Sequence, residues 1–346
     1  MSAGAADGSG AAPGSGAAAG AGAALAPGPP PIEVRGLIKR YGDLTAVAGV
    51  DLTVETGDVY GYLGPNGAGK TTSLRMMLGL IRPTHGSVRL FGRDPMESVR
   101  ALEGVAGFVE APAFYPYLSA RRNLELLAAY DGGGARDRID AALETVELTD
   151  RAGDRVGGYS HGMRQRLGIA SALLRDPKLL LLDEPATGLD PAGMRDMRLL
   201  IRRLADDGMT VLLSSHLLTE VEDICNRVAI VRSGRIVYEG EIAALKRGAG
   251  TSYRLETTDD ERALAVCRAQ AGLTDIRLEH GRICFSADEA VVAELSQALV
   301  EAGALIKAMA PQTVTLEDLF FSFTEGAEAE PGAGSPEPAT AVQPAR

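Results

Sequence analysis

The sequence predicts an α/β fold around a mostly parallel sheet, followed by a small α+β domain. Short apolar runs alternate with helical patterns from Ile32 to about Gly240, as in layered α/β proteins. Residues from about 105 to 174 show helical spacing without a convincing central strand, which indicates a helical insert. After Gly240 the patterns follow the order βαββαβ, which is typical of a ferredoxin-like domain.

These patterns divide the 346 residues into four parts. Residues 1–31 and 326–346 are rich in alanine, glycine and proline. They are expected to be disordered tails, because they have little apolar surface to offset the entropy cost of ordering. Residues 32–240 are expected to form the first domain, with its helical subdomain at about 105–174, and residues 241–325 the α+β domain.

Three segments predict central strands: residues 59–64 (VYGYLG), 178–183 (KLLLLD) and 210–215 (TVLLSS). Continuous apolar runs suit strands that are covered on both faces. Residues 32–37 and 50–55 alternate instead, as half-buried strands do. Each central segment ends next to polar or glycine-rich residues, and α/β sheets bind ligands at the carboxyl ends of their strands. The functional site is therefore expected there.

Composition restricts the possible partners. The net charge of −11 argues against a general nucleic-acid or anionic-membrane binder, so any phosphate site must be local. The cysteines, Cys225, Cys267 and Cys284, are scattered and indicate neither a disulfide framework nor a zinc site, which fits a reducing cytoplasm. No run of about 18 apolar residues occurs, so the chain is not expected to span a bilayer by itself.

A P-loop pattern, GPNGAGKTT, follows the predicted central strand that begins at residue 59 and precedes a helix pattern. Its glycines let backbone N–H groups converge on phosphate oxygens, and the helix N-terminus adds positive potential. Lys70 would reach the β- and γ-phosphates of ATP, and Thr71 would place its hydroxyl on Mg²⁺. The alternative is an ordinary glycine-rich turn. The expected nucleotide-binding residues are Gly64, Pro65, Asn66, Gly67, Ala68, Gly69, Lys70, Thr71 and Thr72.

Two acids end the second central segment. Asp183 is expected to hold the Mg²⁺ water shell opposite the P-loop. Glu184 comes next and can polarise an attacking water as a general base. By themselves, these residues would also fit a strand that ends in solvated acids.

Together the motifs resemble the nucleotide-binding subunit of ABC transporters, from about Ile32 to Gly240. The resemblance implies a RecA-like P-loop NTPase core. It also identifies a signature segment at Tyr159–Met163, a D-loop at Ala186–Pro191, a switch histidine at His216 and an adenine-stacking aromatic at Tyr41.

The family mechanism implies a head-to-tail dimer in which each ATP lies between one P-loop and the partner's signature segment. Ser160, His161 and Gly162 would then contact the γ-phosphate, since a helix N-terminus presents unpaired donors. Ser160 also fits a simple helix N-cap. His216 would reach the γ-phosphate and hold the attacking water, which makes Lys70, Glu184 and His216 the expected catalytic residues.

Two positions depart from the usual family pattern. The signature reads Tyr-Ser-His-Gly-Met instead of Leu-Ser-Gly-Gly-Gln; His161 either adds charge near phosphate when protonated or points into solvent. Glu110 stands where the family normally has glutamine and is expected to bind the cofactor and the metal. The alternative for Glu110 is an exposed loop acid.

The signature and the α+β domain resemble the daunorubicin and bacitracin resistance branch. This implies an ATPase subunit on the inner face of the cell membrane that drives a separate permease, exporting a hydrophobic drug, antibiotic or lipid. The competing class is a soluble ABC ATPase in translation or DNA repair. A single cassette without a coiled coil or zinc modules, and an acidic balance, argue against that class. A module without hydrolysis is opposed by intact Lys70, Asp183, Glu184 and His216.

Overall fold

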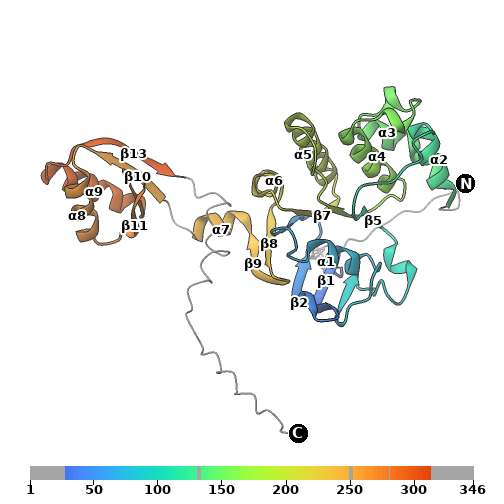
Figure 1. Ribbon diagram of the computed structural model, residues 1–346, viewed down its shortest axis with the longest axis horizontal. Helices are drawn as coiled ribbons and strands as arrows, with labels where there is room; N and C mark the ends of the chain where they lie inside the picture. Colours follow the sequence, from blue (N-terminus) through green and yellow to red (C-terminus); the bar gives the residue numbers. More distant parts are fainter. Residues whose placement is uncertain (1–27, 131–133, 249–251, 280, 313–346) are drawn as a thin grey trace, which may run out of the picture.

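The protein is represented by a computed structural model, which describes residues 28–130, 134–248, 252–279 and 281–312. These residues form three sheets with helices packed against them (Figure 1). Most of the expected tail 1–31 and all of residues 313–346 lie outside the described part. Residues 28–31 are described, and the Pro31 carbonyl accepts a hydrogen bond from the Phe91 N–H at 3.2 Å.

The largest sheet has six strands in the order β5-β6-β7-β3-β8-β9. All neighbours are parallel except β8 and β9. The three predicted central strands are confirmed as β3, β6 and β7, whose residues are all buried. The bounds are β3 (Val59–Leu63), β5 (Val105–Phe108), β6 (Leu179–Asp183), β7 (Thr210–Ser215), β8 (Arg227–Arg232) and β9 (Arg235–Glu241).

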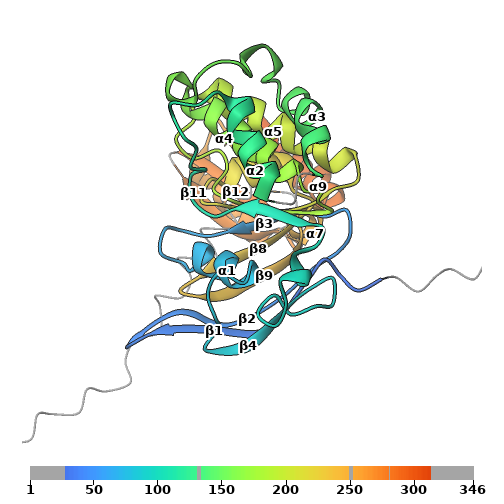
Figure 2. The same ribbon diagram turned by 90° about the vertical axis from the view of Figure 1, so that its right-hand side faces the viewer.

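A second, antiparallel sheet has the order β2-β1-β4, with β1 (Ile32–Tyr41), β2 (Leu44–Val54) and β4 (His85–Leu90). The two alternating segments predicted as strands are confirmed, but they pair in this sheet and not in the parallel one. Figure 2 shows α1 (Lys70–Met77) between the two sheets. Leu74 and Met77 of α1 are fully buried there with residues of both sheets, so this packing holds the P-loop helix in place.

The helices between β5 and β7 lie on the other side of the large sheet (Figure 2). They are α2 (Ala120–Tyr130), α3 (Ile139–Thr145), α4 (His161–Leu173) and α5 (Pro191–Asp206). Short 3₁₀ turns span Val99–Leu102, Arg136–Arg138, Thr149–Arg151 and Val156–Gly158. The segment expected to be helical from about residue 105 begins instead with strand β5. Four residues paired with β6 on one side only are too short for a recognisable pattern.

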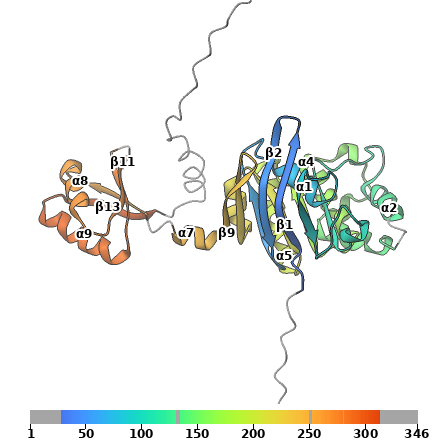
Figure 3. The ribbon, with the colours of Figure 1, turned by 90° about the horizontal axis from the view of Figure 1, so that it is seen from below.

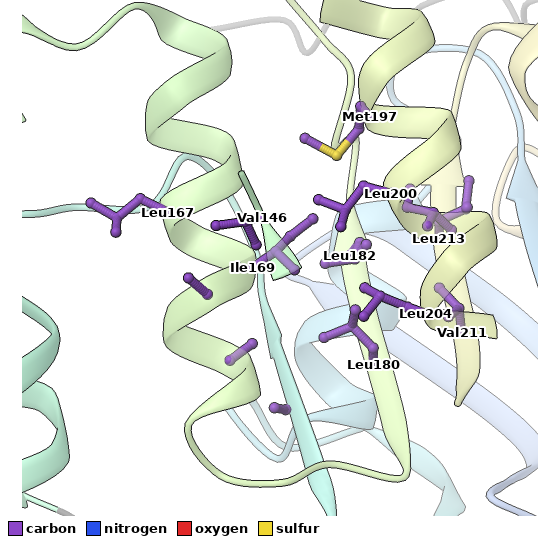
Figure 4. Close-up of a cluster of buried hydrophobic side chains, with 14 of the residues drawn as sticks. Val146, Leu167, Ile169, Leu180, Leu182, Met197, Leu200, Leu204, Val211 and Leu213 are labelled. Carbon is purple, nitrogen blue, oxygen red and sulfur yellow. The ribbon is translucent and has the colours of Figure 1, made fainter. Parts of the chain in front are cut away.

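An apolar core joins α4 and α5 to the large sheet. Figure 4 shows leucines of β6 between the two helices: Leu180 and Leu182, with Ile169 on one side and Leu200 and Leu204 on the other. Each of these side chains is at most 3% exposed. A buried leucine makes many close contacts that would be lost if its side chain were removed. This core therefore holds β6, and the residues at its carboxyl end, in place.

Two further helices follow β7 and β9. They are α6 (Leu218–Ile224) and α7 (Ile242–Gly248). Ile242 and Leu245 of α7 are buried in the same core as α4 and α5. The first turn of α7 therefore packs with the large sheet, although the expected boundary after Gly240 assigns it to the second domain.

The third sheet is antiparallel, with the order β11-β12-β10-β13. Helices α8 and α9 pack against it (Figures 1 and 3), around a separate apolar core that includes Leu255, Phe285 and Leu295. The βαββαβ order is as predicted. The sequence pattern also predicts a final helix near Leu316, which lies outside the described residues. The bounds are β10 (Ser252–Thr257), α8 (Asp260–Ala269), β11 (Thr274–Glu279), β12 (Arg282–Ser286), α9 (Glu289–Glu301) and β13 (Ile306–Gln312).

Within the described ranges, no helix combines the length and the apolar character needed to cross a bilayer.

Candidate nucleotide site

The glycine-rich segment connects β3 to α1, and two of its glycines lie too close to neighbouring backbone to carry a side chain. A Cβ on Gly64 would lie 2.5 Å from the Val231 carbonyl oxygen, and one on Gly69 would lie 2.3 Å from that of Ala46. Gly69 also has a φ of +100° and forms the N-cap of α1. Since a glycine has no side chain to bond the first-turn N–H groups, these donors are available to an anion. Thr71 and Thr72 lie in this turn.

Lys70 is 6% exposed and points back over the loop. Its Nζ donates to the Gly64 carbonyl at 2.7 Å and to the Pro65 carbonyl at 3.3 Å. The same atom lies 3.1 Å from Oε1 of Glu184. The structure therefore brings the P-loop lysine and the expected general base into direct contact.

Glu184 sits in a tight turn immediately after β6, with a φ of +49°. Its N–H donates to Oγ of Ser214 at 3.0 Å. Its Oε2 lies 2.7 Å from Nδ1 of His216 and accepts a hydrogen bond from Oγ1 of Thr187 at 2.9 Å. The carboxylate is therefore oriented from two sides besides Lys70.

Burial raises the pKa of the Glu184 carboxyl, but the bond with His216 and the charge of Lys70 outweigh burial. The net effect lowers the pKa below its ordinary value of 4.5. Glu184 is then ionised at neutral pH and can only accept hydrogen bonds. His216 must therefore carry its proton on Nδ1, which leaves Nε2 as the other reactive ring atom.

Asp183 ends β6 and is 7% exposed. It pairs in register with Ser214 of β7, whose hydroxyl donates to Oδ1 of Asp183. The sequence reasoning missed Ser214 and Thr187. The two serines that end a central strand were a usable signal for Ser214, but only the strand order places them beside β6.

The donor chemistry around Asp183 fits Mg²⁺. A carboxylate and the Thr71 hydroxyl are the hard oxygen ligands that this ion prefers, and it commonly binds through one or two protein ligands together with phosphates. The described residues contain no group of three or more His, Cys, Asp or Glu side chains placed to hold a metal.

Among the described residues, no hydrogen bond or ion pair joins Glu110 to this group. Its side chain is 67% exposed and forms an ion pair with Arg75 in the last turn of α1. Glu110 has a φ of +76°, so the backbone turns sharply here after β5. The alternative reading of an exposed loop acid describes this state, and the expected role in metal binding stays a prediction.

Tyr41 ends β1 and is 47% exposed, with Nζ of Lys39 5.0 Å from the centre of its ring. An exposed ring at a strand end can stack on a planar base. The expected adenine contact remains a prediction.

The signature segment begins α4. Ser160 is its N-cap, and its Oγ accepts a hydrogen bond from the Met163 N–H. His161 does not point into open solvent: its ring is half-buried, and Nε2 lies 3.0 Å from the Thr187 carbonyl oxygen. A cavity of about 350 Å³ lies beside this contact. It is lined by residues of the signature segment and of the loop after β6, including Gly162, Gly188 and Asp190.

Comparisons with known proteins identify the family. A model described as ABC transporter matches residues 47–187. The chain is 36% identical over 297 residues to the bacitracin transport ATP-binding protein BcrA of Enterococcus faecalis, covering 85% of this chain and 96% of that protein. It is 36% identical over 301 residues to the daunorubicin resistance ATP-binding protein DrrA3 of Streptomyces coeruleorubidus, covering 85% and 95%.

A solved structure shows the same core. It is the dimeric ATP-binding cassette MJ0796 bound to ADP and Pi in a post-hydrolysis state, with a TM-score of 0.54 and 25% identity, covering 61% of this chain and 98% of that one. The relatives match the drug and antibiotic resistance branch that the signature resembles. This chain belongs to the family of ABC transporter ATP-binding subunits, which bind and hydrolyse ATP.

Proposed function

We propose that this subunit drives a separate membrane permease in the export of a hydrophobic drug, antibiotic or lipid. Support comes from near-complete alignment with the ATP-binding proteins for bacitracin transport and daunorubicin resistance. A soluble role in translation or DNA repair is not favoured, because these relatives are transport and resistance proteins. The subunit would lie on the cytoplasmic face of the membrane and be held there by the permease. Nucleic acid is not proposed as a partner.

The observation that carries the catalytic proposal is the joint contact of Glu184 with Lys70 and His216. We infer that Lys70 exchanges its contacts with the Gly64 and Pro65 carbonyls for phosphate oxygens, to which an ammonium is a stronger donor. The N–H groups of the first turn of α1 would bind the same phosphates. Tyr41 would stack on the adenine ring.

Glu184 would act as the general base. Its pKa is lowered, so it is ionised at neutral pH and can accept a proton from an attacking water. His216 donates from Nδ1 to Glu184 and would present Nε2 toward that water and the γ-phosphate. The base is therefore held in one orientation before the nucleotide arrives, and less reorganisation is needed during the reaction.

Thr71 and Asp183 would hold Mg²⁺ through the threonine hydroxyl and one carboxylate. The ion would supply positive charge beside the phosphates. Ser214 would keep the Asp183 carboxylate oriented toward it through their hydrogen bond. Glu110 would join this set only after leaving Arg75.

The second half of each site would come from a partner subunit in a head-to-tail dimer. Ser160, His161 and Gly162 begin α4, and a helix N-terminus supplies donors to an anion. The related cassette bound to ADP and Pi is a dimer.

We also propose that the C-terminal sheet is ferredoxin-like. Numbered within this part, its strands lie in the spatial order 2-3-1-4, and all neighbours are antiparallel. Its βαββαβ order fits that class.

Glu184→Gln in the full-length protein tests the catalytic part of the proposal. Turnover should fall roughly 100-fold or more while ATP binding is kept, and the variant should accumulate as an ATP-bound dimer, measured by size-exclusion chromatography with light scattering.

The membrane partner is tested separately. An affinity-tagged chain should co-purify from detergent extracts with a membrane-spanning protein. Wild-type turnover would move the base elsewhere, and a chain that always purifies without a membrane partner would reopen the soluble role.

A further inference from the structure

His161 contacts a residue that the ATPase mechanism does not otherwise use. Its Nε2 lies 3.0 Å from the carbonyl oxygen of Thr187, in the loop between β6 and α5. A carbonyl can only accept, so Nε2 must carry a hydrogen. Both the neutral Nε2–H tautomer and the cation meet this requirement. The contact thus does not depend on protonation of the ring.

The loop is shaped to receive the ring. Gly188 has a φ of +77°, and a Cβ there would lie 3.4 Å from Nε2 of His161. A larger residue at this position would be strained by the positive φ. On the neighbouring turn, a Cβ on Gly162 would meet Leu189 at 3.6 Å. The start of α4 and this loop therefore lie close together at two points, Gly188 beside His161 and Gly162 beside Leu189.

Thr187 extends the contact to the base. Its Oγ1 donates to Oε2 of Glu184 at 2.9 Å, and its N–H donates to the Glu184 carbonyl at 3.1 Å. The histidine thus holds the backbone of the residue whose hydroxyl orients the Glu184 carboxylate. Two hydrogen bonds in series join the signature helix to the base of the same chain.

We propose that His161 is a positioning residue for ATP hydrolysis: it fixes Thr187 so that the threonine hydroxyl aims Glu184. This inference rests on the proposed role of Glu184 as general base. The expectation that His161 adds charge near the partner's phosphate is separate from this role and stays a prediction. Since the signature helix would also meet the partner's ATP, the same two bonds link one nucleotide site of the dimer to the base of the other.

Two matched pairs of variants separate this role from packing. His161→Gln keeps an N–H donor near the position of Nε2, whereas His161→Phe keeps a ring without a donor. Thr187→Ser keeps the hydroxyl, whereas Thr187→Val keeps the shape without it. ATP hydrolysis by the full-length variants is measured as kcat and KM, with melting temperatures as the check on folding.

His161→Phe and Thr187→Val should each lower kcat about three- to tenfold, with much smaller changes in KM. His161→Gln and Thr187→Ser should each lose less than their partner variant. The double variant His161→Phe/Thr187→Val should be no slower than the slower single variant, because both break one series.

Several results would overturn the inference: wild-type kcat in His161→Phe, an effect confined to KM, no difference between the Gln and Phe variants, or multiplied losses in the double variant. Should His161→Phe not fold, the Thr187 pair and His161→Gln decide the question.

Turnover of Glu184→Gln is measured in the same assay, as the test of the general base. If that variant retains turnover, the general-base assignment fails; if only the His161 and Thr187 variants are normal, the positioning role alone fails.

Discussion

Replacing Lys70 with methionine should weaken ATP binding while leaving the fold intact. Methionine has a similar length and no charge, so the substitution removes the ammonium and little volume. In the free protein this ammonium bonds the Gly64 and Pro65 carbonyls and lies 3.1 Å from Glu184. Glu184 keeps its bonds with His216 and Thr187 in the variant.

The loss of affinity can be estimated from these contacts. A hydrogen bond to a charged group contributes about 1.5 to 3 kcal/mol, and two such bonds to phosphate oxygens would contribute about 3 to 6 kcal/mol. Part of this gain is offset, because binding gives up the two carbonyl contacts of the free state. Taking the lower value to allow for this offset, and about 1.4 kcal/mol for each tenfold change, Lys70→Met should raise the Kd for ATP by about 100-fold.

The measurement is a titration of the full-length protein with a fluorescent ATP analogue. Lys178→Met is the matched control, because Lys178 is exposed and precedes β6 at the opposite end of the same sheet. It should bind like the wild type. A Kd for Lys70→Met within about threefold of the wild type, which corresponds to less than the contribution of one hydrogen bond, would refute the assignment of Lys70 to the phosphates.

Three other perturbations follow from the geometry. Gly69→Ala should lower the melting temperature far more than Gly67→Ala: both have positive φ, but an added Cβ meets a backbone carbonyl only at Gly69; equal losses would contradict the close approach. Leu182→Ala should cost about 2 to 5 kcal/mol in urea unfolding, whereas Leu199→Ala, 48% exposed, should cost much less. The folded-state pKa of Glu184 is lowered, so its contacts stabilise the protein above its unfolded-state pKa and are lost as pH falls through the folded value. The difference in free energy of unfolding between wild type and Glu184→Gln should therefore shrink as pH falls below about 4.5; a difference independent of pH would argue against a depressed pKa.

Local patterns were sufficient for much of this molecule. The runs of buried residues in β3, β6 and β7 and the βαββαβ order of the C-terminal part are confirmed. The glycine-rich loop likewise lies between a strand and a helix. Each of these features depends on neighbours close in sequence, or on burial of a continuous apolar run, so periodicity and spacing predict it.

Other features were missed or misread because they depend on residues far apart in the chain. Strand β5 is four residues long and is defined by pairing with β6. The first turn of α7 packs with the large sheet, because Ile242 is buried in the same apolar core as residues of α4 and α5. Glu110 pairs with Arg75 across 35 positions, and no local pattern announces such a pair.

The sequence by itself determined the candidates for the chemistry: a lysine in a glycine loop, two acids after a buried strand, and a histidine after the next. Only the tertiary structure decided how they are oriented. Ser214 reaches Asp183 because β6 and β7 are neighbours in register, and His161 reaches Thr187 because α4 packs beside the loop after β6. Hydrogen bonds act over about 3 Å, so their partners are set by how the strands and helices pack and not by their order along the chain.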